Sequence, residues 1–351
     1  MEPDSKTKFV LSFVALALAA TAYVRPADSA TAESGHTTMV MALAFSPDGR
    51  SLFVTSDHDL ILKSVATDET LKTFRGHRSV VRAVAVSHDG KTLLSSSSDG
   101  AIKLWGVETG RVISELAKGT PGDDSNFRAH VDAVAFSPDS RLAASGGNAG
   151  EVTLWDVSTG KAIHVLHESP HASIECIVFS PRGDSLFTTG GSGKVVRWDV
   201  RSGREILGFE VDPLSGVNSL SISADGNKAL AVAGLRIELW DAKSGKKLLT
   251  FSEMLKGYYT PRCAAFTPDG VHAVSGDDSR VFVWDLKTGR RLKELDDPPF
   301  GHVESIAVSP DGELVVVGDI RGNVRGWRLR TGEPLWPKVR RGVVAQVGLS
   351  Y

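Results

Sequence analysis

The sequence predicts an all-β fold, a seven-bladed β-propeller of four-stranded antiparallel blades, because one short phrase recurs at regular intervals. This corner motif, Phe45-Ser46-Pro47-Asp48-Gly49 in its first copy, returns seven times along 351 residues at steps of 41 to 50 residues. The later copies begin at Val86, Phe136, Phe179, Ile222, Phe266 and Val308. Repeats of this length suit four-stranded blades, and one such unit cannot bury its own faces. Seven units can close a ring.

Each unit contains the same four strand signals, and blade 2 illustrates their order. An apolar strand ends at the corner motif, where aspartate and glycine supply the turn chemistry. The second strand, residues 92–95, ends at a polar turn, residues 98–100. The third strand covers residues 102–105, and a turn at residues 108–110 leads into the fourth strand, residues 112–116. Four short strands joined by tight turns form one propeller blade.

Tryptophans mark the end of the third strand in most units. Trp-Asp pairs begin at Trp155, Trp198, Trp240 and Trp284, and altered pairs begin at Lys63, Trp105 and Trp327. Seven units in register resemble the WD40-repeat family of β-propellers, and the resemblance extends from about Gly35 to Val339. With the N-terminal segment described below, the chain looks like an exported bacterial-type member.

The resemblance also implies a hydrogen-bonded set of His, Ser or Thr, Asp and Trp within a blade. Blade 2 contains every member, which the resemblance assigns to His77, Ser97, Asp99 and Trp105, with Ser95 as the other candidate serine. The remaining units are incomplete: His36 lies in a unit without the tryptophan, Tyr258 replaces the histidine of blade 6, and His130 and His302 stand nearer to their motifs. We therefore expect most blades to be held by apolar packing.

The first 32 residues have the composition of a targeting segment. Lys6 and Lys8 precede an apolar run at residues 9–20, and Ala-x-Ala sites begin at Ala20 and Ala30. This order is typical of a secretory signal peptide. It predicts a signal peptide and short linker at residues 1–32 and a propeller at residues 33–341 that is exported to the periplasm or the extracellular space. An uncleaved membrane anchor is the alternative, because the run is close to the lower length limit of a membrane-spanning helix.

The last residues resemble the beginning of another blade. Residues 342–351 read like an extra first strand that stops where the corner motif would begin. Residues 333–338 are expected to supply the outer strand of blade 7, since their prolines suit only an edge strand. We expect the terminal segment to lie at the seam of blades 1 and 7. The alternative is that the chain is a piece of a longer propeller.

Composition argues against nucleic-acid partners, and the two cysteines argue against a disulfide. The formal net charge is −2 with 23% charged residues, without the basic excess of a nucleic-acid binder. Cys176 and Cys263 occupy equivalent first strands two blades apart, too far for a bond that requires Cα atoms within about 7 Å. Both are therefore interpreted as buried free thiols. No cofactor is indicated.

Catalytic motifs are weak. The segment His167-Glu168-Ser169-Pro170-His171 matches H-E-x-x-H, but that zinc motif requires a helix, and Pro170 inside a helix would cost about 3 kcal/mol. A polar connecting loop, with no metal and no enzyme activity, is the interpretation. The alternative is a metal-assisted hydrolase or lactonase-type propeller with ligands near the central channel, for which His130, Asp132, His302 and Glu304 would be the candidates. Their two blades are nearly opposite, which is too far apart for one ion.

The resemblance places the loops between fourth and first strands, and between second and third strands, on one partner-binding face, here called the upper face. Four residues before each corner motif it places a ring around the channel mouth: Met41, Arg82, Asp132, Glu175, Asn218, Arg262 and Glu304. Three connecting loops add Asp123, Asp124 and Phe127, then Tyr258 and Tyr259, then Phe300 beside His302. Aromatic residues among charges are usual anchors of an interface. The chain is therefore predicted to be a non-catalytic scaffold that binds a protein or peptide partner. For each residue alone the alternative is a structural role, with Tyr258 filling the place of the missing histidine.

Overall fold

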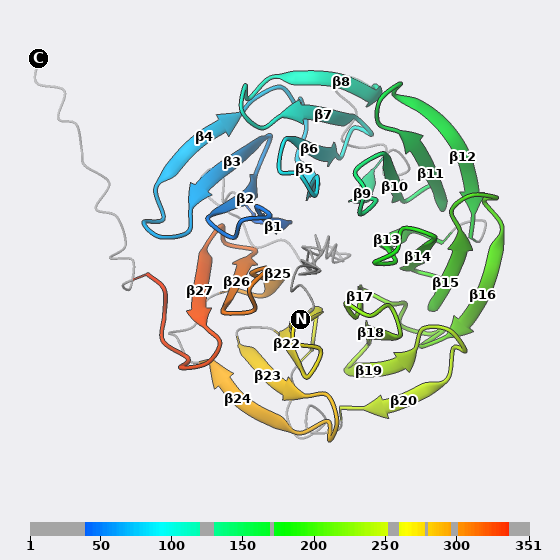
Figure 1. Ribbon diagram of the computed structural model, residues 1–351, viewed down its shortest axis with the longest axis vertical. Coiled ribbons are helices and arrows are strands. Elements are labelled where there is room, and N and C mark those ends of the chain that lie inside the picture. The colour runs from blue at the N-terminus through cyan, green and yellow to red at the C-terminus, as the bar shows by residue number, and fades with distance from the viewer. Residues whose placement is uncertain are drawn as a thin grey trace, which may run out of the picture.

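The computed structural model describes residues 39–119, 130–168, 172–251, 260–277, 280–295 and 301–336. Within these ranges 27 strands form seven antiparallel sheets that surround a central axis (Figure 1). The fold is therefore the predicted all-β seven-bladed propeller. The described residues contain no helical segment with the length and hydropathy that crossing a membrane requires. The predicted signal peptide and linker at residues 1–32 and the segment at residues 342–351 lie outside the described residues.

The first three blades each have four strands in chain order. Blade 1 contains β1 (Leu43–Phe45), β2 (Ser51–Ser56), β3 (Asp59–Ser64) and β4 (Thr70–Phe74). Blade 2 contains β5 (Val81–Val86), β6 (Thr92–Ser97), β7 (Ile102–Gly106) and β8 (Val112–Ala117). Blade 3 contains β9 (Val131–Phe136), β10 (Leu142–Gly147), β11 (Glu151–Asp156) and β12 (Lys161–His167).

The next three blades repeat this order. Blade 4 contains β13 (Ile174–Phe179), β14 (Ser185–Gly190), β15 (Lys194–Asp199) and β16 (Glu205–Glu210). Blade 5 contains β17 (Ser219–Ile222), β18 (Lys228–Ala233), β19 (Arg236–Asp241) and β20 (Lys247–Thr250). Blade 6 contains β21 (Cys263–Phe266), β22 (His272–Gly276), β23 (Val281–Asp285) and β24 (Arg291–Leu295). The first strand of a blade lies nearest the axis and the fourth lies at the perimeter (Figure 1).

Blade 7 has three named strands, β25 (Val303–Val308), β26 (Leu314–Asp319) and β27 (Val324–Arg328). Its fourth position begins with a single antiparallel bridge between Trp327 and Pro334, and the N–H of Leu335 donates to the carbonyl of Gly326 at 2.8 Å. The chain after β27 thus starts along the expected edge, up to Trp336. The remainder of the predicted outer strand lies outside the described residues.

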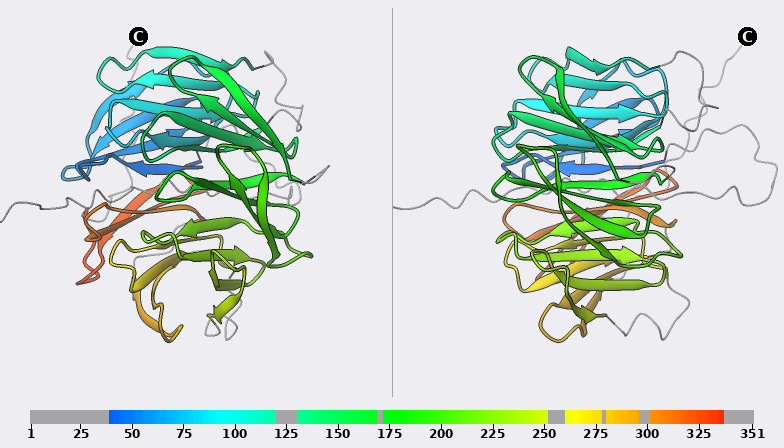
Figure 2. Two further views of the ribbon diagram at one scale, coloured as in Figure 1. Left: turned by 45° about the vertical axis from the view of Figure 1, so that its right-hand side comes forward. Right: turned by 90° about the vertical axis from the view of Figure 1, so that its right-hand side faces the viewer.

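The core lies between the blades rather than inside any one of them. Side views show the sheets standing side by side around the ring (Figure 2). Apolar side chains of neighbouring sheets form seven buried clusters, and one of them joins Ala307 and Val316 of blade 7 to Leu43 and Phe45 of blade 1. Burial of apolar surface therefore closes the ring as well as stabilising each interface. The buried free thiols are confirmed for Cys176 and Cys263, and burial raises the pKa of Cys176 to about 12.

The corner motif is a hydrogen-bonded turn, which explains its serine and aspartate. In blade 1 the hydroxyl of Ser46 donates to Asp48 Oδ1 and accepts the N–H of Ser51 at 3.0 Å. Asp48 Oδ1 also accepts the N–H of Arg50 at 3.0 Å, and Gly49 has a φ of 70°. These hydrogen bonds hold the pKa of the Asp48 carboxyl below its usual value. Blade 4 has arginine at the aspartate position, and there Ser180 donates to Asp184 instead.

The corner motifs also touch each other around the lower end of the channel. A Cβ added to the motif glycine would lie 3.3–3.5 Å from the motif proline of the preceding blade in five of the seven cases. Blades 2 and 3 differ, because His88 replaces the proline and Ser140 replaces the next glycine. There the N–H of His88 donates to the Ser140 hydroxyl at 2.9 Å. A hydrogen bond thus takes the place of the proline–glycine contact.

Candidate functional site: the upper face

Four charged residues of the ring predicted on the upper face form two ion pairs that join neighbouring blades. Arg82 Nε lies 2.5 Å from Asp132 Oδ1, which links blade 2 to blade 3. Arg262 Nη1 lies 3.1 Å from Glu304 Oε1, which links blade 6 to blade 7. The acidic side chains are 2% and 1% exposed. The burial of these carboxylates is tolerated because each is paired with an arginine, since an unpaired buried charge strongly destabilises the folded state.

Of the other three described members of the ring, Met41 and Glu175 are buried and Asn218 is half-buried. Glu175 is buried and accepts a hydrogen bond from the Ser173 hydroxyl at 2.6 Å. Met41 is buried, and its N–H donates to the hydroxyl of Thr55 at 2.9 Å. Partner contact by Arg82, Asp132, Glu175, Arg262, His302 and Glu304 stays a prediction. The aromatic and acidic loop residues predicted beside them lie outside the described residues: Asp123, Asp124, Phe127, Tyr258, Tyr259 and Phe300.

The candidate metal ligands fall into separate blades. His130 and Asp132 belong to blade 3, whereas His302 and Glu304 belong to blade 7. The carboxylate of each pair faces an arginine of the preceding blade. Across the described part of the chain, no three His, Cys, Asp or Glu side chains come close enough together to hold one metal ion.

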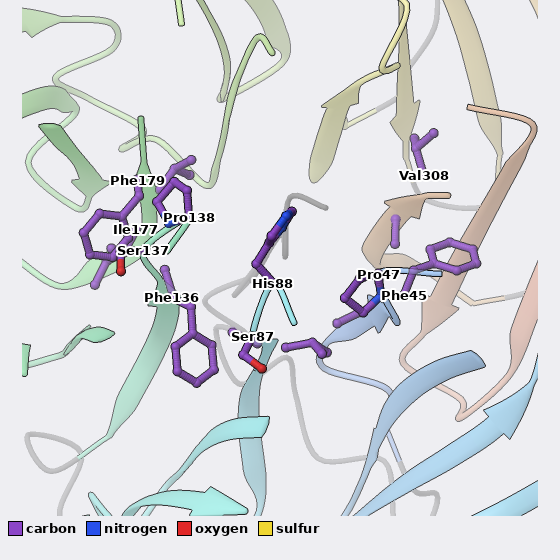
Figure 3. Close-up of a pocket in the computed structure, with 16 residues that line it drawn as sticks. Phe45, Pro47, Ser87, His88, Phe136, Ser137, Pro138, Ile177, Phe179 and Val308 are labelled. Carbon is purple, nitrogen blue, oxygen red and sulfur yellow. The ribbon is translucent and has the colours of Figure 1, made fainter. Parts of the chain in front are cut away.

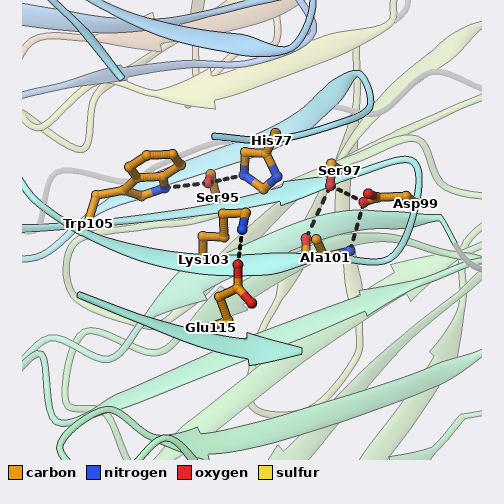
Figure 4. A network of polar contacts seen from close by, with 8 residues as sticks. All are labelled: His77, Ser95, Ser97, Asp99, Ala101, Lys103, Trp105 and Glu115. Carbon is orange, nitrogen blue, oxygen red and sulfur yellow. Dashed lines mark hydrogen bonds and ion pairs between the residues drawn. The ribbon is translucent and has the colours of Figure 1, made fainter. Parts of the chain in front are cut away.

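The predicted polar set of blade 2 forms around Ser95 (Figure 4). The Ser95 hydroxyl lies 2.6 Å from His77 Nε2 and accepts the indole N–H of Trp105 at 2.8 Å. Ser97 instead donates to Asp99 Oδ1 at 2.5 Å, so the assignment of Ser97 as the serine between histidine and tryptophan was wrong. The cause is the register of β6 against β7: Leu93 pairs with Trp105, so Ser95 lies two positions from the partner of the tryptophan and Ser97 lies four. Burial, with the nearby Lys103 ammonium, lowers the pKa of His77 to about 4.

Three further blades contain the same bond between a tryptophan and a hydroxyl. Indole N–H groups donate at 2.8–2.9 Å from Trp155 to Ser145, from Trp198 to Thr188 and from Trp284 to Ser275. The expectation that most blades rely on apolar packing therefore understated their polar contacts. Blade 5 has Ala231 at the equivalent position, and its Trp240 packs against Phe209 with ring centroids 5.0 Å apart.

Glu168 of the connecting loop takes the place of the histidine in blade 4. The Thr188 hydroxyl, which accepts the Trp198 indole N–H, itself donates to Glu168 Oε2 at 2.8 Å. The Ser192 hydroxyl donates to the other carboxylate oxygen. Burial raises the pKa of Glu168, while both hydroxyls oppose that rise. The motif-like segment at residues 167–171 thus supplies a structural carboxylate, as a connecting loop would.

An apolar pair that the sequence analysis missed projects from the upper face at blade 5. Leu214 is 95% exposed in the loop between blades 4 and 5, and Leu235 is 54% exposed in the turn between β18 and β19. The two turns touch, since a Cβ at Gly234 would lie 3.0 Å from Ser215 Oγ. The available signal was a leucine placed inside a polar turn, Pro213-Leu214-Ser215-Gly216.

Hydrogen bonds within the loop that carries Leu214, and from this loop to the turn at Gly193, fix its backbone. Asp212 Oδ1 accepts the N–H groups of Leu214 and Ser215 at 3.0 and 3.2 Å. The N–H of Asp212 donates to the carbonyl of Gly193 at 3.1 Å, and Gly216 donates back to Asp212. Gly193 has a φ of 72°, and a Cβ there would lie 2.1 Å from the Asp212 carbonyl oxygen. The fully exposed leucine is therefore presented by a fixed turn.

Comparison with protein families identifies the repeats. The profile of the family described as WD domain, G-beta repeat, matches residues 30–62, 68–106, 124–156, 160–199, 247–285 and 290–328. These six segments cover more than half of the chain and include every blade except blade 5. A comparison with curated protein sequences gives no match.

Proposed function

Because the chain belongs to the WD40-repeat family, we propose that it is a non-catalytic scaffold that binds a protein or peptide partner on the upper face of its propeller. Fold alone does not fix function, so the proposal depends on the surface. The observation that carries it is the exposed pair Leu214 and Leu235, fixed on two touching turns. A turn that is already fixed loses little conformational entropy on binding, which favours the affinity of a partner for the side chains that it carries.

The pair supplies enough apolar surface to matter for affinity. Burial of one leucine side chain contributes about 1.5–3 kcal/mol. Both leucines lie on the face to which the family resemblance assigns the aromatic loops, so a partner could cover them together with the channel mouth. The buried acidic side chains of the ring would then lie beneath the partner and support the site, and the leucines would make the main contacts.

Substitution of the pair tests this proposal. Partners captured from the exported fraction would first be identified and purified, and their affinity for the propeller measured by calorimetry. We expect Leu214→Ser with Leu235→Ser to weaken binding by at least about tenfold, given the burial energy of leucine. Leu71→Ser with Leu292→Ser is the matched control, because these perimeter leucines are 54% and 55% exposed. Equal losses in both double variants, or none in either, would contradict binding through the upper face.

We also propose that the propeller is exported, either free or anchored by its N-terminal segment. The order of charge, apolar run and Ala-x-Ala sites supports a signal peptide. Intact-mass analysis of the exported protein should show a chain that begins between Tyr23 and Glu33. A mass that retains Met1 in the membrane fraction would favour the anchor, and recovery only from the cytoplasm would contradict export.

A further inference from the structure

The lower end of the central channel leaves room for only a small group. A pocket at the corner motifs of blades 1 to 4 and 7 measures about 50 Å³ and is lined by Phe45, Phe136 and Phe179 among others (Figure 3). A cavity that holds benzene measures about 150 Å³, so this pocket admits at most a group of a few atoms. The exposed leucines at blade 5 impose no such limit, and the charges around them indicate what can bind there.

Arg236 directly follows Leu235, and a tight hairpin fixes the position of both. Two residues join β18 to β19, because Ala233 pairs with Arg236. Gly234 has a φ of 53°, and glycine at the first position is typical of such two-residue turns. The exposed leucine and the exposed arginine are therefore consecutive side chains on a backbone with little freedom.

The arginine lies on the side of blade 5 that faces blade 4. Alternate residues of a strand share a face of the sheet, so Arg236 lies on the same face of β19 as Trp240. Trp240 packs with Phe209 of blade 4 in one buried cluster. The loop that carries Leu214 leads from β16 of blade 4 to β17 of blade 5. A partner that covers this loop and the hairpin would therefore also cover Arg236.

Arg236 differs from the neighbouring cations because no anion of the described chain pairs with it. Lys194 of blade 4 lies 4.0 Å from Glu210, and Lys247 of blade 5 lies 3.1 Å from Glu238. Among the described residues, no hydrogen bond or ion pair involves the Arg236 side chain, which is exposed. A partner that covered the guanidinium without an acceptor would remove its water and leave its charge uncompensated, which opposes binding.

Asp212 limits the negative charge that the site accepts. Its Oδ1 accepts the N–H groups of Leu214 and Ser215 at 3.0 and 3.2 Å. Its Oδ2 would lie 3.3 Å from a Cβ at Gly234, so the carboxylate is fixed between the two turns. A single cation near a fixed anion suits a ligand group with one negative charge, whereas a phosphate carries a charge of about −1.5 to −2.

We propose that the partner of the upper face presents an acidic peptide segment, with apolar side chains on Leu214 and Leu235 and a neighbouring carboxylate on the guanidinium of Arg236. This inference rests on the proposed use of the leucine pair and adds the charge of the partner. The planar guanidinium can donate two parallel hydrogen bonds to the two oxygens of a carboxylate. A partner without the carboxylate would leave the arginine desolvated, so Arg236 supplies specificity.

Short peptides test the proposal on the full chain. The probes are acetylated and amidated heptapeptides, Ser-Leu-Thr-Leu-Thr-X-Ser, in which X is glutamate, glutamine or phosphoserine. Binding is followed by nuclear magnetic resonance through the methyl signals of Leu214 and Leu235. We expect saturable binding of the glutamate peptide, roughly five- to thirtyfold tighter than that of the glutamine peptide, between the effects of an exposed and a buried charge pair. No saturable binding of the glutamate peptide, equal binding of the glutamine peptide, or tighter binding of the phosphoserine peptide would overturn the assignment.

Variants separate the charge from the leucine pair. Arg236→Gln should abolish the preference for glutamate over glutamine. Arg201→Gln is the matched control and should retain it, because this exposed arginine lies between β15 and β16, at the other end of the blades. Leu214→Ser with Leu235→Ser should weaken the binding of both peptides. If Arg236→Gln keeps the preference, the carboxylate contact is wrong while binding through the leucines stands. If the leucine variant binds both peptides like the unaltered chain, the proposed function itself fails.

Discussion

Single residues in this propeller show how one structural position can be filled by different chemistry. His77 in blade 2 and Glu168 in blade 4 each contact a hydroxyl that accepts a tryptophan N–H. Burial penalises the charged form of both, which lowers the pKa of His77 and raises that of Glu168. The contributions of the two residues to the free energy of unfolding therefore change in opposite directions with pH.

Glu168→Gln should reveal this dependence. The folded-state pKa of Glu168 lies above the ordinary value of 4.5, so its stabilising contribution is present below that value and is lost as pH rises through the folded pKa. Glutamine, which cannot ionise, should therefore gain stability relative to the unaltered chain on going from pH 4.5 to pH 8. Urea unfolding at several pH values would measure the difference. A constant difference across that range would contradict a raised pKa.

At the scale of the blade, ion pairs at the upper ends of first strands align neighbouring sheets. Arg262 precedes β21 and Glu304 lies in β25, the innermost strands of blades 6 and 7. The same junction contains a buried apolar cluster and a hydrogen bond from the Val303 N–H to the carbonyl of Asp277. At the junction of blades 2 and 3, Asp132 pairs with its arginine in the same way as Glu304. These ion pairs therefore hold neighbouring blades together and do not join strands of the same blade.

Arg262→Met should lower the free energy of unfolding by about 2–4 kcal/mol, because Glu304 would keep a buried charge without its arginine. Glu304→Gln in the same chain should recover most of the loss. Arg75→Met is the control, since its side chain is 79% exposed and 3.4 Å from Asp59. An exposed pair of that kind contributes about 0–1 kcal/mol. Chemical denaturation would compare the three variants, and equal effects of Arg262→Met and Arg75→Met would contradict the assigned role.

For the whole molecule, the decisive feature is the closure between blade 7 and blade 1. The N–H of Val40 donates to the carbonyl of Asp319 at 3.1 Å, and the indole N–H of Trp336 donates to the carbonyl of Val65 at 3.0 Å. Trp336 and Leu335 also pack against the apolar cluster that joins the two blades. The described chain after β27 therefore adds to the backbone hydrogen bond and the apolar cluster that join the last blade to the first.

Trp336→Ala should weaken this seam by about 2–3 kcal/mol, somewhat less than the loss of a fully buried tryptophan, because its side chain is partly exposed. Trp336→Phe should lose only about 1 kcal/mol, the value of the hydrogen bond. Hydrogen exchange should accelerate first in β1 to β3 and β25 to β27. Equal acceleration in blades 3 and 4 would show that closure does not depend on Trp336.

The repeat determined what could be predicted from the sequence: the number of blades, the order of strands and the turn at each corner. These features follow from hydrogen bonds between residues a few positions apart, as between Ser46 and Asp48. The exposed or buried state of the ring residues could not be predicted in this way. Arg82 and Asp132 are 50 positions apart and meet only because two sheets stand side by side.

Tertiary structure alone decided the residues that now define the candidate sites. Ser95 rather than Ser97 bonds to Trp105 because it lies nearer to the tryptophan along the paired strands, and Glu168 meets Thr188 across 20 positions of the chain. Leu214 is an ordinary leucine in the sequence, and the bonds between two blades leave it exposed. The local sequence pattern thus determined the strands and turns of each blade. Contacts between blades decided which side chains remain exposed to a partner, because these contacts form only when the ring closes.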